Sequence, residues 1–106
     1  MTTEIHASRI FTEPEAAERR AALLPQILDC VQQVKEVDGG YSLKFMADLE
    51  TMILVMDWLL LERTCNAFLR FKLSIESNAG PSWVDITGPA GTQDFLKTEF
   101  ALSRWL

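Results

Sequence analysis

One stretch of strictly alternating residues constrains the fold of this chain more than any other feature. Four apolar residues occupy every second position, with polar or charged residues between them: Leu69, Phe71, Leu73 and Ile75 alternate with Arg70, Lys72, Ser74 and Glu76. Successive side chains of a strand point to opposite faces of its sheet, so the stretch predicts a strand with one dry face and one wet face. We expect Phe71 and Leu73 in the core, and Arg70 and Lys72 in water.

Turn residues divide the neighbouring apolar segments into further short strands. The turn Asn78–Pro81 separates the alternating strand from a return strand at Trp83–Thr87. Earlier in the chain, Val34–Val37 and Tyr41–Phe45 flank Asp38-Gly39-Gly40, which supplies the positive φ that a tight turn requires. The sequence therefore predicts two hairpins, and with them four antiparallel strands.

Capping residues mark the first and last of three predicted helices. Thr12 and Glu15 fit a capping box, and the helix that they begin is expected to kink or split at Pro25. Its apolar stripe has helical spacing: Ala17, Ala21, Leu24, Leu28 and Val31. Thr92 is expected to cap the last helix, which carries Phe95, Leu96, Glu99, Phe100 and Leu102.

The central helix, from a cap at Asp48 to about Asn66, is apolar on two sides. A wide face contains Leu49, Met52, Ile53, Met56, Leu59 and Leu60. A second stripe on nearly the opposite side contains Leu54, Trp58, Leu61 and Cys65. Because a surface helix has a single apolar face, this pattern predicts burial on two sides. The second stripe could be covered by the first helix, by the last helix, or by another copy of the protein.

The order of these elements predicts an α+β fold. Helix, hairpin, helix, hairpin and helix (α-ββ-α-ββ-α) imply a two-layer structure, in which a four-stranded antiparallel sheet carries helices mainly on one face. The chain has 106 residues, of which 48% are hydrophobic and 24% charged, values typical of one globular domain. We expect a loose N-terminal arm at 1–11 and a single domain at 12–106.

Net charge argues against two classes of partner. The chain carries −5 at neutral pH and has an isoelectric point of about 4.8, which disfavours nucleic acid and anionic membranes. The most apolar run, Met52–Leu61, is interrupted by Asp57 and is shorter than the roughly 20 residues of a membrane span. The N-terminus has no signal-peptide pattern, so we expect a cytoplasmic protein.

The wet face of the sheet could in outline resemble an RNA platform. Lys44, Arg70 and Lys72 are expected there, with Trp83 beside them. Acidic and hydroxyl side chains on the same face dilute this basic character: Ser42, Ser74, Glu76 and Asp85. The sequence therefore favours a solvated sheet face and no nucleic-acid partner.

Residues for nucleophilic or metal chemistry are scarce. The single histidine, His6, falls on the predicted arm, so a histidine-assisted nucleophile has no positioned base. There is no Cys-x-x-Cys motif, although Cys30 and Cys65 could converge to hold a soft metal. We expect no catalytic residues, no metal and no cofactor.

Cys65 has the most specific local context. The segment Leu61–Phe71 resembles small, uncharacterised bacterial proteins in which the pattern reads E-R-x-C-C-P-F-L-x-F. The matching residues are Glu62, Arg63, Cys65, Phe68, Leu69 and Phe71, while Asn66 and Ala67 replace the second cysteine and the proline. The resemblance extends in pieces to Asp38-Gly39-Gly40-Tyr41, Trp83 and Thr87-Gly88-Pro89-x-Gly91. It implies no activity that can be carried over.

Two interpretations of function remain open. The first is a non-catalytic binding or interaction module, expected to be a homodimer with an interface at Leu54, Trp58 and Leu61. The second is a thiol-centred small-molecule, redox or soft-metal site formed by Cys65 with Glu62 and Trp58. A position near a helix C-terminus disfavours a thiolate at Cys65, which favours the first interpretation.

Overall fold

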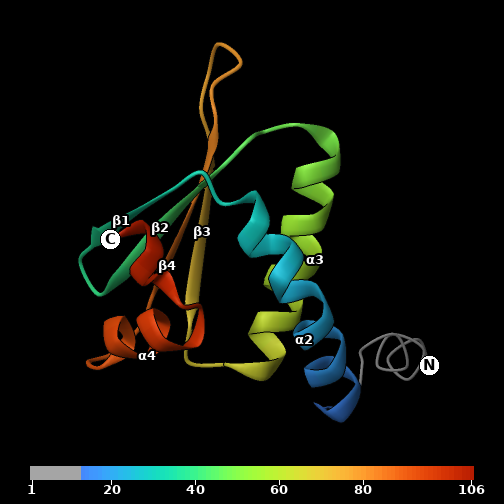
Figure 1. Cartoon of the computed structure of the whole chain (residues 1–106), viewed down its shortest axis with the longest axis vertical. Coiled ribbons are helices and arrows are strands. Elements are labelled where there is room, and N and C mark those ends of the chain that lie inside the picture. Colours follow the sequence, from blue (N-terminus) through green and yellow to red (C-terminus); the bar gives the residue numbers. More distant parts are fainter. Residues whose placement is uncertain (1–12) are drawn as a thin grey trace, which may run out of the picture.

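Four antiparallel strands form one sheet in the computed structural model, which describes residues 13–106 (Figure 1). The strands are β1 (Gln33–Val37), β2 (Gly40–Phe45), β3 (Arg70–Ile75) and β4 (Ser82–Thr87), in the spatial order β1-β2-β4-β3. The second strands of the two hairpins, β2 and β4, therefore lie inside the sheet, and the first strands, β1 and β3, form its edges. The predicted arm at 1–11 and the capping residue Thr12 lie outside the described residues.

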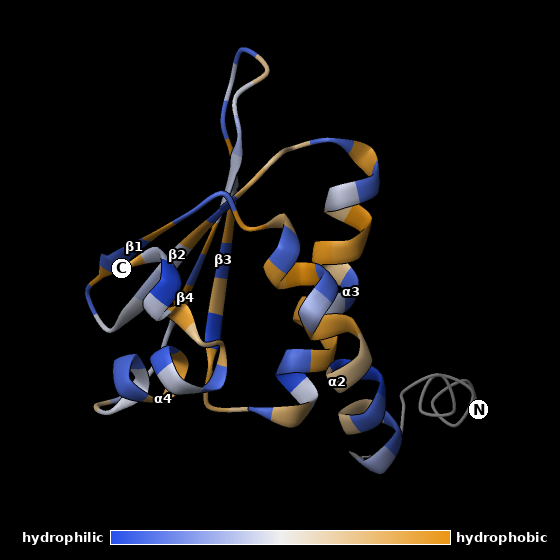
Figure 2. Ribbon diagram, viewed as in Figure 1, coloured by the Kyte–Doolittle hydropathy of each residue, from blue (hydrophilic) through white to orange (hydrophobic). Residues whose placement is uncertain are grey.

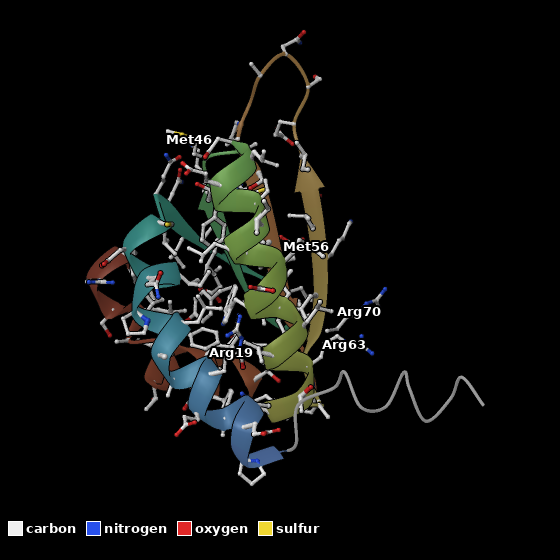
Figure 3. The ribbon with its side chains drawn as sticks, turned by 90° about the vertical axis from the view of Figure 1, so that its right-hand side faces the viewer. Arg19, Met46, Met56, Arg63 and Arg70 are labelled. Carbon is white, nitrogen blue, oxygen red and sulfur yellow. The ribbon has the colours of Figure 1, made fainter. Side chains whose placement is uncertain are left out.

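Helices cover one face of this sheet, as expected for a two-layer α+β fold. They are α2 (Glu13–Cys30), α3 (Leu49–Cys65), α4 (Thr92–Glu99) and the short 3-10 helix η1 (Leu102–Trp105). The helices α2 and α3 lie side by side and run in opposite directions (Figures 1 and 3). Phe100, after α4, packs edge-on against Trp58 of α3 with ring centroids 5.7 Å apart. This contact places the C-terminal helices on the same side of the sheet as α3.

The core lies between the helices and the inner face of the sheet. Strand register places Tyr41 beside Ile86 and Leu43 beside Val84, and all four side chains are buried. The helices, and Phe100 directly after α4, contribute further side chains with no exposed surface: Ile27, Val55, Trp58, Leu96, Phe100 and Leu102. Burial of this much apolar surface is the main stabilising term of the fold.

The first hairpin needs glycine for two different reasons. Gly39 has φ of 80°, a conformation that residues with a Cβ rarely adopt. Gly40 pairs with Thr87, and a Cβ at Gly40 would overlap the carbonyl group of Ile86. The predicted turn at Asp38-Gly39-Gly40 is confirmed, and its second glycine also allows β2 and β4 to approach closely.

The buried face of α2 differs from the predicted stripe. Ala16, Leu23 and Ile27 are buried, and Arg20 completes the same stripe at helical spacing, whereas Ala17 and Ala21 are exposed. The predicted stripe was wrong at Ala17 and Ala21, where it excluded a charged residue from the inner face, whereas Leu24, Leu28 and Val31 do contact the core. The helix also passes through Pro25 as a single element and is not split there.

Two further local predictions need correction. Thr92 does not cap α4: Gly91 is the capping residue, with φ of 95°, and the Thr92 hydroxyl donates to the carbonyl of Pro89 at 2.7 Å. In β3 the predicted register is right, since Arg70 and Lys72 are exposed. Phe71 and Leu73 are only half-buried, however, because β3 is an edge strand with a neighbour on one side alone.

Candidate interaction surface

The wide apolar face predicted for α3 is largely exposed rather than buried. Leu49 is 76% exposed, Ile53 59%, Met56 43% and Leu60 54%, and these residues repeat at the spacing of one helix face. Only Leu59 of the predicted face is buried. Met52 is half-buried against the core, and the prediction was wrong for the four exposed members because α2 packs on a different side of α3. Figure 2 shows this helix as mostly hydrophobic along its length.

The exposed apolar surface continues beyond α3 toward the edge of the sheet. Ile75, at the end of β3, is 62% exposed. Ile75 shares the inner sheet face with the half-buried Phe71 and Leu73. Figure 3 shows Met56 on the side of α3 that faces β3. We define the α3–β3 face as Leu49, Ile53, Met56, Leu60 and Ile75.

A surface of this kind is unusual for a protein that functions as a monomer. Single exposed apolar residues are common, but contiguous patches larger than a few hundred Å² mark interaction sites in most cases. The α3–β3 face adds a second feature, because β3 is an edge strand and no strand of residues 13–106 pairs with its outer side. Unpaired N–H and C=O groups of such an edge can bind another chain.

Charges of opposite sign lie at the two ends of α3. Asp48 and Glu50 are at its N-terminal end. Arg63 is in its last turn, and Arg70 begins β3 close to that end (Figure 3). The α3–β3 face is therefore bounded by carboxylates at one end and by guanidinium groups at the other.

Glu62 and Trp58, which the sequence suggested as parts of a ligand site, belong to a buried polar cluster. The indole Nε1 of Trp58 donates to Glu62 Oε1 at 3.0 Å, and Asn66 Nδ2 donates to Glu62 Oε2 at 2.6 Å. Arg20 of α2 donates from Nε to Glu62 Oε1 at 2.7 Å and contacts Glu99 through Nη1 at 2.8 Å. The carboxylate of Glu62 is fully buried, so these donors stabilise a charge that water cannot reach.

The cluster also affects the titration of Arg20. Burial alone would lower its pKa, but the hydrogen bond and charge of Glu62, followed by those of Glu99, raise the pKa above its ordinary value. Arg20 therefore stays charged in the folded protein. Because the cluster satisfies Glu62 from within the chain, its role is to join α2 to α3 rather than to bind a ligand.

The two cysteines are far apart. Cys30 ends α2 and Cys65 ends α3. Since the two helices are antiparallel, their C-termini lie at opposite ends of the pair (Figure 1). The two-thiol metal site considered from the sequence is not formed. Among residues 13–106, no group of three or more histidine, cysteine or carboxylate side chains could hold a metal ion.

The stripe predicted as a dimer interface is closed within the chain. Trp58 and Leu61 are buried, and Leu54 is half-buried. The neighbouring α2 and Phe100 cover this side of α3. Trp58 and Leu61 thus offer no surface to a second subunit, and the open side of α3 is the one that was expected in the core.

The outer face of the sheet carries the basic residues predicted for it, but its aromatic ring is already occupied. The amino group of Lys35 lies 4.2 Å from the Trp83 ring centroid, and that of Lys44 lies 6.0 Å from it. Asp85 accepts a hydrogen bond from Ser42 on the same face. These contacts leave little of Trp83 for a nucleic-acid base to stack on.

A depression of about 240 Å³ lies between the end of α2 and η1, lined by Leu28, Asp29, Val31, Arg104 and Trp105. Neither cysteine belongs to this lining, nor do the residues of the Glu62 cluster.

None of the helices within residues 13–106 is long and apolar enough to cross a membrane.

No protein-family model, no curated protein and no solved structure matches this chain. The resemblance of Leu61–Phe71 to small bacterial proteins therefore stays a prediction.

Proposed function

We propose that this chain is a small, non-catalytic, cytoplasmic interaction module that assembles as a homodimer through the α3–β3 face. The observation that carries the proposal is the exposed stripe Leu49, Ile53, Met56 and Leu60 beside an unpaired strand edge. Covering this stripe would remove apolar surface from water, which favours association. A cytoplasmic setting fits two cysteines that no disulfide joins.

Two-fold symmetry makes a second copy a suitable partner. A two-fold interface pairs the same surface patch with itself, so an apolar stripe meets an apolar stripe. When the axis is perpendicular to α3, the two copies of the helix run antiparallel. The Asp48–Glu50 end of one copy then lies near the Arg63 end of the other. Charge complementarity of this kind fixes orientation as well as adding affinity.

Sedimentation analysis of a matched pair of variants tests the proposal. Leu60 lies in the α3–β3 face and Leu106 lies outside it, and their exposed fractions are nearly equal, 54% and 55%. We expect wild type to be a dimer at about 100 micromolar, and Leu60→Lys to weaken dimerisation by about tenfold or more. Leu106→Lys should leave the dimer unchanged.

Two results would overturn the proposal. A wild-type monomer at that concentration would show that the face binds no second copy with useful affinity. Equal effects of Leu60→Lys and Leu106→Lys would show that the substitution acts through general solubility and not through the α3–β3 face. Ile53→Lys is a second variant of the face, and it should behave as Leu60→Lys does.

A further inference from the structure

We infer that the two copies join through β3, strand to antiparallel strand, so that two four-stranded sheets become one sheet of eight strands. This inference rests on the proposed homodimer and adds the geometry of its interface. It follows from which backbone groups of β3 point away from β4, and from which side chains a two-fold axis would place opposite one another.

The hydrogen-bond pattern of the sheet defines the groups at the free edge of β3. The amide of Glu76 donates to the carbonyl of Pro81 at 2.9 Å, in register with the β3–β4 pairing. Hydrogen-bonded and non-hydrogen-bonded pairs alternate along an antiparallel ladder. Residues 70, 72 and 74 therefore bond to β4. The N–H and C=O groups of Phe71, Leu73 and Ile75 point to the open edge.

A hydrogen bond at the end of the β2–β4 ladder supports this assignment. The amide of Gly88 donates to the carbonyl of Gly39 at 3.2 Å, which makes the even-numbered positions of β4 bond to β2. The backbone N–H and C=O groups of the odd-numbered residues of β4 then point toward β3, where their partners are even-numbered residues. Both observations show that the backbone N–H and C=O groups of the odd-numbered residues of β3 point to the open edge of the sheet.

These outward groups restrict the register of a symmetric pair. Hydrogen bonds across the new interface must join odd-numbered residues of both copies. The inner, apolar faces of the two sheets must also lie on the same side of the joined sheet. One such register places Leu73 opposite the same residue of the partner, and Phe71 opposite the partner's Ile75. On the outer face it places Arg70 opposite the partner's Glu76. Each dimer would thus contain two such opposite-charge pairs, which stabilise antiparallel strands.

Neighbouring registers are less favourable. A shift by two residues in one direction places Lys72 opposite the same lysine of the partner, which brings like charges together. A shift by two in the other direction centres the pair on Ser74 and shortens the overlap within β3. A shift by one would set the inner face of one copy against the outer face of the other. The register centred on Leu73 avoids all three penalties.

The opposite edge of the sheet is less available than β3. The short helix η1 packs beside β1. The side chain of Gln93 donates to the carbonyls of Val37 and Gly40 at 3.0 and 3.2 Å, at the hairpin end of β1. The strand β3 has six residues and contains no proline, and no strand of residues 13–106 pairs with its open edge. Edge strands of monomeric proteins are often shorter, interrupted by a bulge, or covered by another element.

This arrangement also brings the apolar stripes together. Coincident inner faces place both α3 helices on the same side of the continuous sheet, in antiparallel orientation. Figure 3 shows that α3 is the helix next to the β3 edge, with α2 farther from it. The open side of each α3 would then face the other across the junction, so that the stripes cover one another while the strands pair.

A cysteine scan tests the register directly. In a Cys30→Ser/Cys65→Ser background, Leu73→Cys should form a disulfide-linked dimer on mild oxidation. The Cα atoms of a hydrogen-bonded antiparallel pair are about 5.5 Å apart, within the range that disulfides bridge. Lys72→Cys and Ser74→Cys are the matched controls, since each would crosslink best in one of the two shifted registers. We expect the greatest yield at Leu73→Cys.

A charge exchange provides the second readout. Arg70→Glu or Glu76→Arg alone should weaken the dimer by about tenfold, because each dimer would lose two cross-strand pairs. The double variant Arg70→Glu/Glu76→Arg should recover most of the affinity. If Leu60→Lys dissociates the dimer while no scan position crosslinks and both charge variants are neutral, pairing through β3 is overturned and the homodimer stands. A monomeric wild type would overturn both.

Discussion

Arg20 of α2 and Glu62 of α3 form an ion pair in which Nε lies 2.7 Å from Oε1, with the glutamate fully buried. The pair connects two antiparallel helices that also share an exposed ion pair, Arg19 with Asp57, and apolar contacts. An ion pair in such a place gives a fixed alignment of the helices, because only one register brings the guanidinium and the carboxylate together.

Removing Glu62 should destabilise the protein strongly. Glu62→Ala leaves the charge of Arg20 in the interior without its main partner, and we expect a loss of about 3–5 kcal/mol in the free energy of unfolding. The control is Asp57→Ala, which breaks the exposed pair between Asp57 and Arg19 at 3.6 Å and should cost about 0–1 kcal/mol. Denaturant unfolding measures both. Similar losses would contradict a special role for the buried pair.

Two phenylalanines provide a comparison of core and edge. Phe100 has no exposed surface, so Phe100→Ala should cost about 3–5 kcal/mol. Phe71 is half-buried on the edge strand, and Phe71→Ala should cost clearly less in the monomer. Unfolding at a concentration where the protein is monomeric measures the difference. An equal or greater loss for Phe71→Ala would show that the edge of the sheet is more tightly packed than the structure indicates.

The hairpins and the limits of α3 were predictable because their signals are local. The glycines of the first turn and the cap at Asp48 each act on residues next to them, and the structure places both as predicted. The inner face of α2 was not predictable in this way. Arg20 is buried because of Glu62, 42 residues away, and no local pattern shows that partnership.

The open side of α3 illustrates the same limit for the candidate site. Its sequence indicates two apolar sides but not which of them the rest of the chain covers. That choice depends on the packing of α2, whose buried residues Ala16, Leu23 and Ile27 lie on a different face from the predicted stripe. The pairing of Trp58 with Glu62 could have been found from their i, i+4 spacing, which places them on one side of the helix.

Gly40 should not tolerate a larger residue. Gly40→Ala would place a Cβ against the backbone carbonyl of Ile86, so β2 and β4 could not keep their separation. We expect loss of cooperative thermal unfolding or of soluble expression. Gly91→Ala is a useful contrast, because space is open around that position and only its φ of 95° opposes the change. A Gly40→Ala protein as stable as Gly91→Ala would contradict the close approach of the strands.

The cap of α3 should make stability depend on acidic pH. Hydrogen bonds from Thr51 lower the pKa of Asp48 below its ordinary value of 3.8. A carboxylate with a lowered folded pKa stabilises the fold above the ordinary value, and the contribution is lost as pH falls through the folded pKa. Asp48→Asn should therefore be less stable than wild type at neutral pH, and the difference should shrink below about pH 4. Thr51→Ala should reduce that pH dependence, and a difference that is constant with pH would contradict the assignment.

The outer face of the sheet should not bind nucleic acid at physiological salt, although it carries Lys35, Lys44, Arg70 and Lys72. The chain as a whole has a charge of −5, which opposes the approach of a polyanion. Two of the lysines lie over Trp83, the one aromatic ring that residues 13–106 place on this face, so within that part of the chain bases have no open ring on which to stack. Titration of the intrinsic tryptophan fluorescence with single-stranded RNA and with duplex DNA should show no saturable change. A micromolar affinity that weakens with salt and is lost in Lys35→Glu would contradict this prediction, and would make the face a binding surface in its own right.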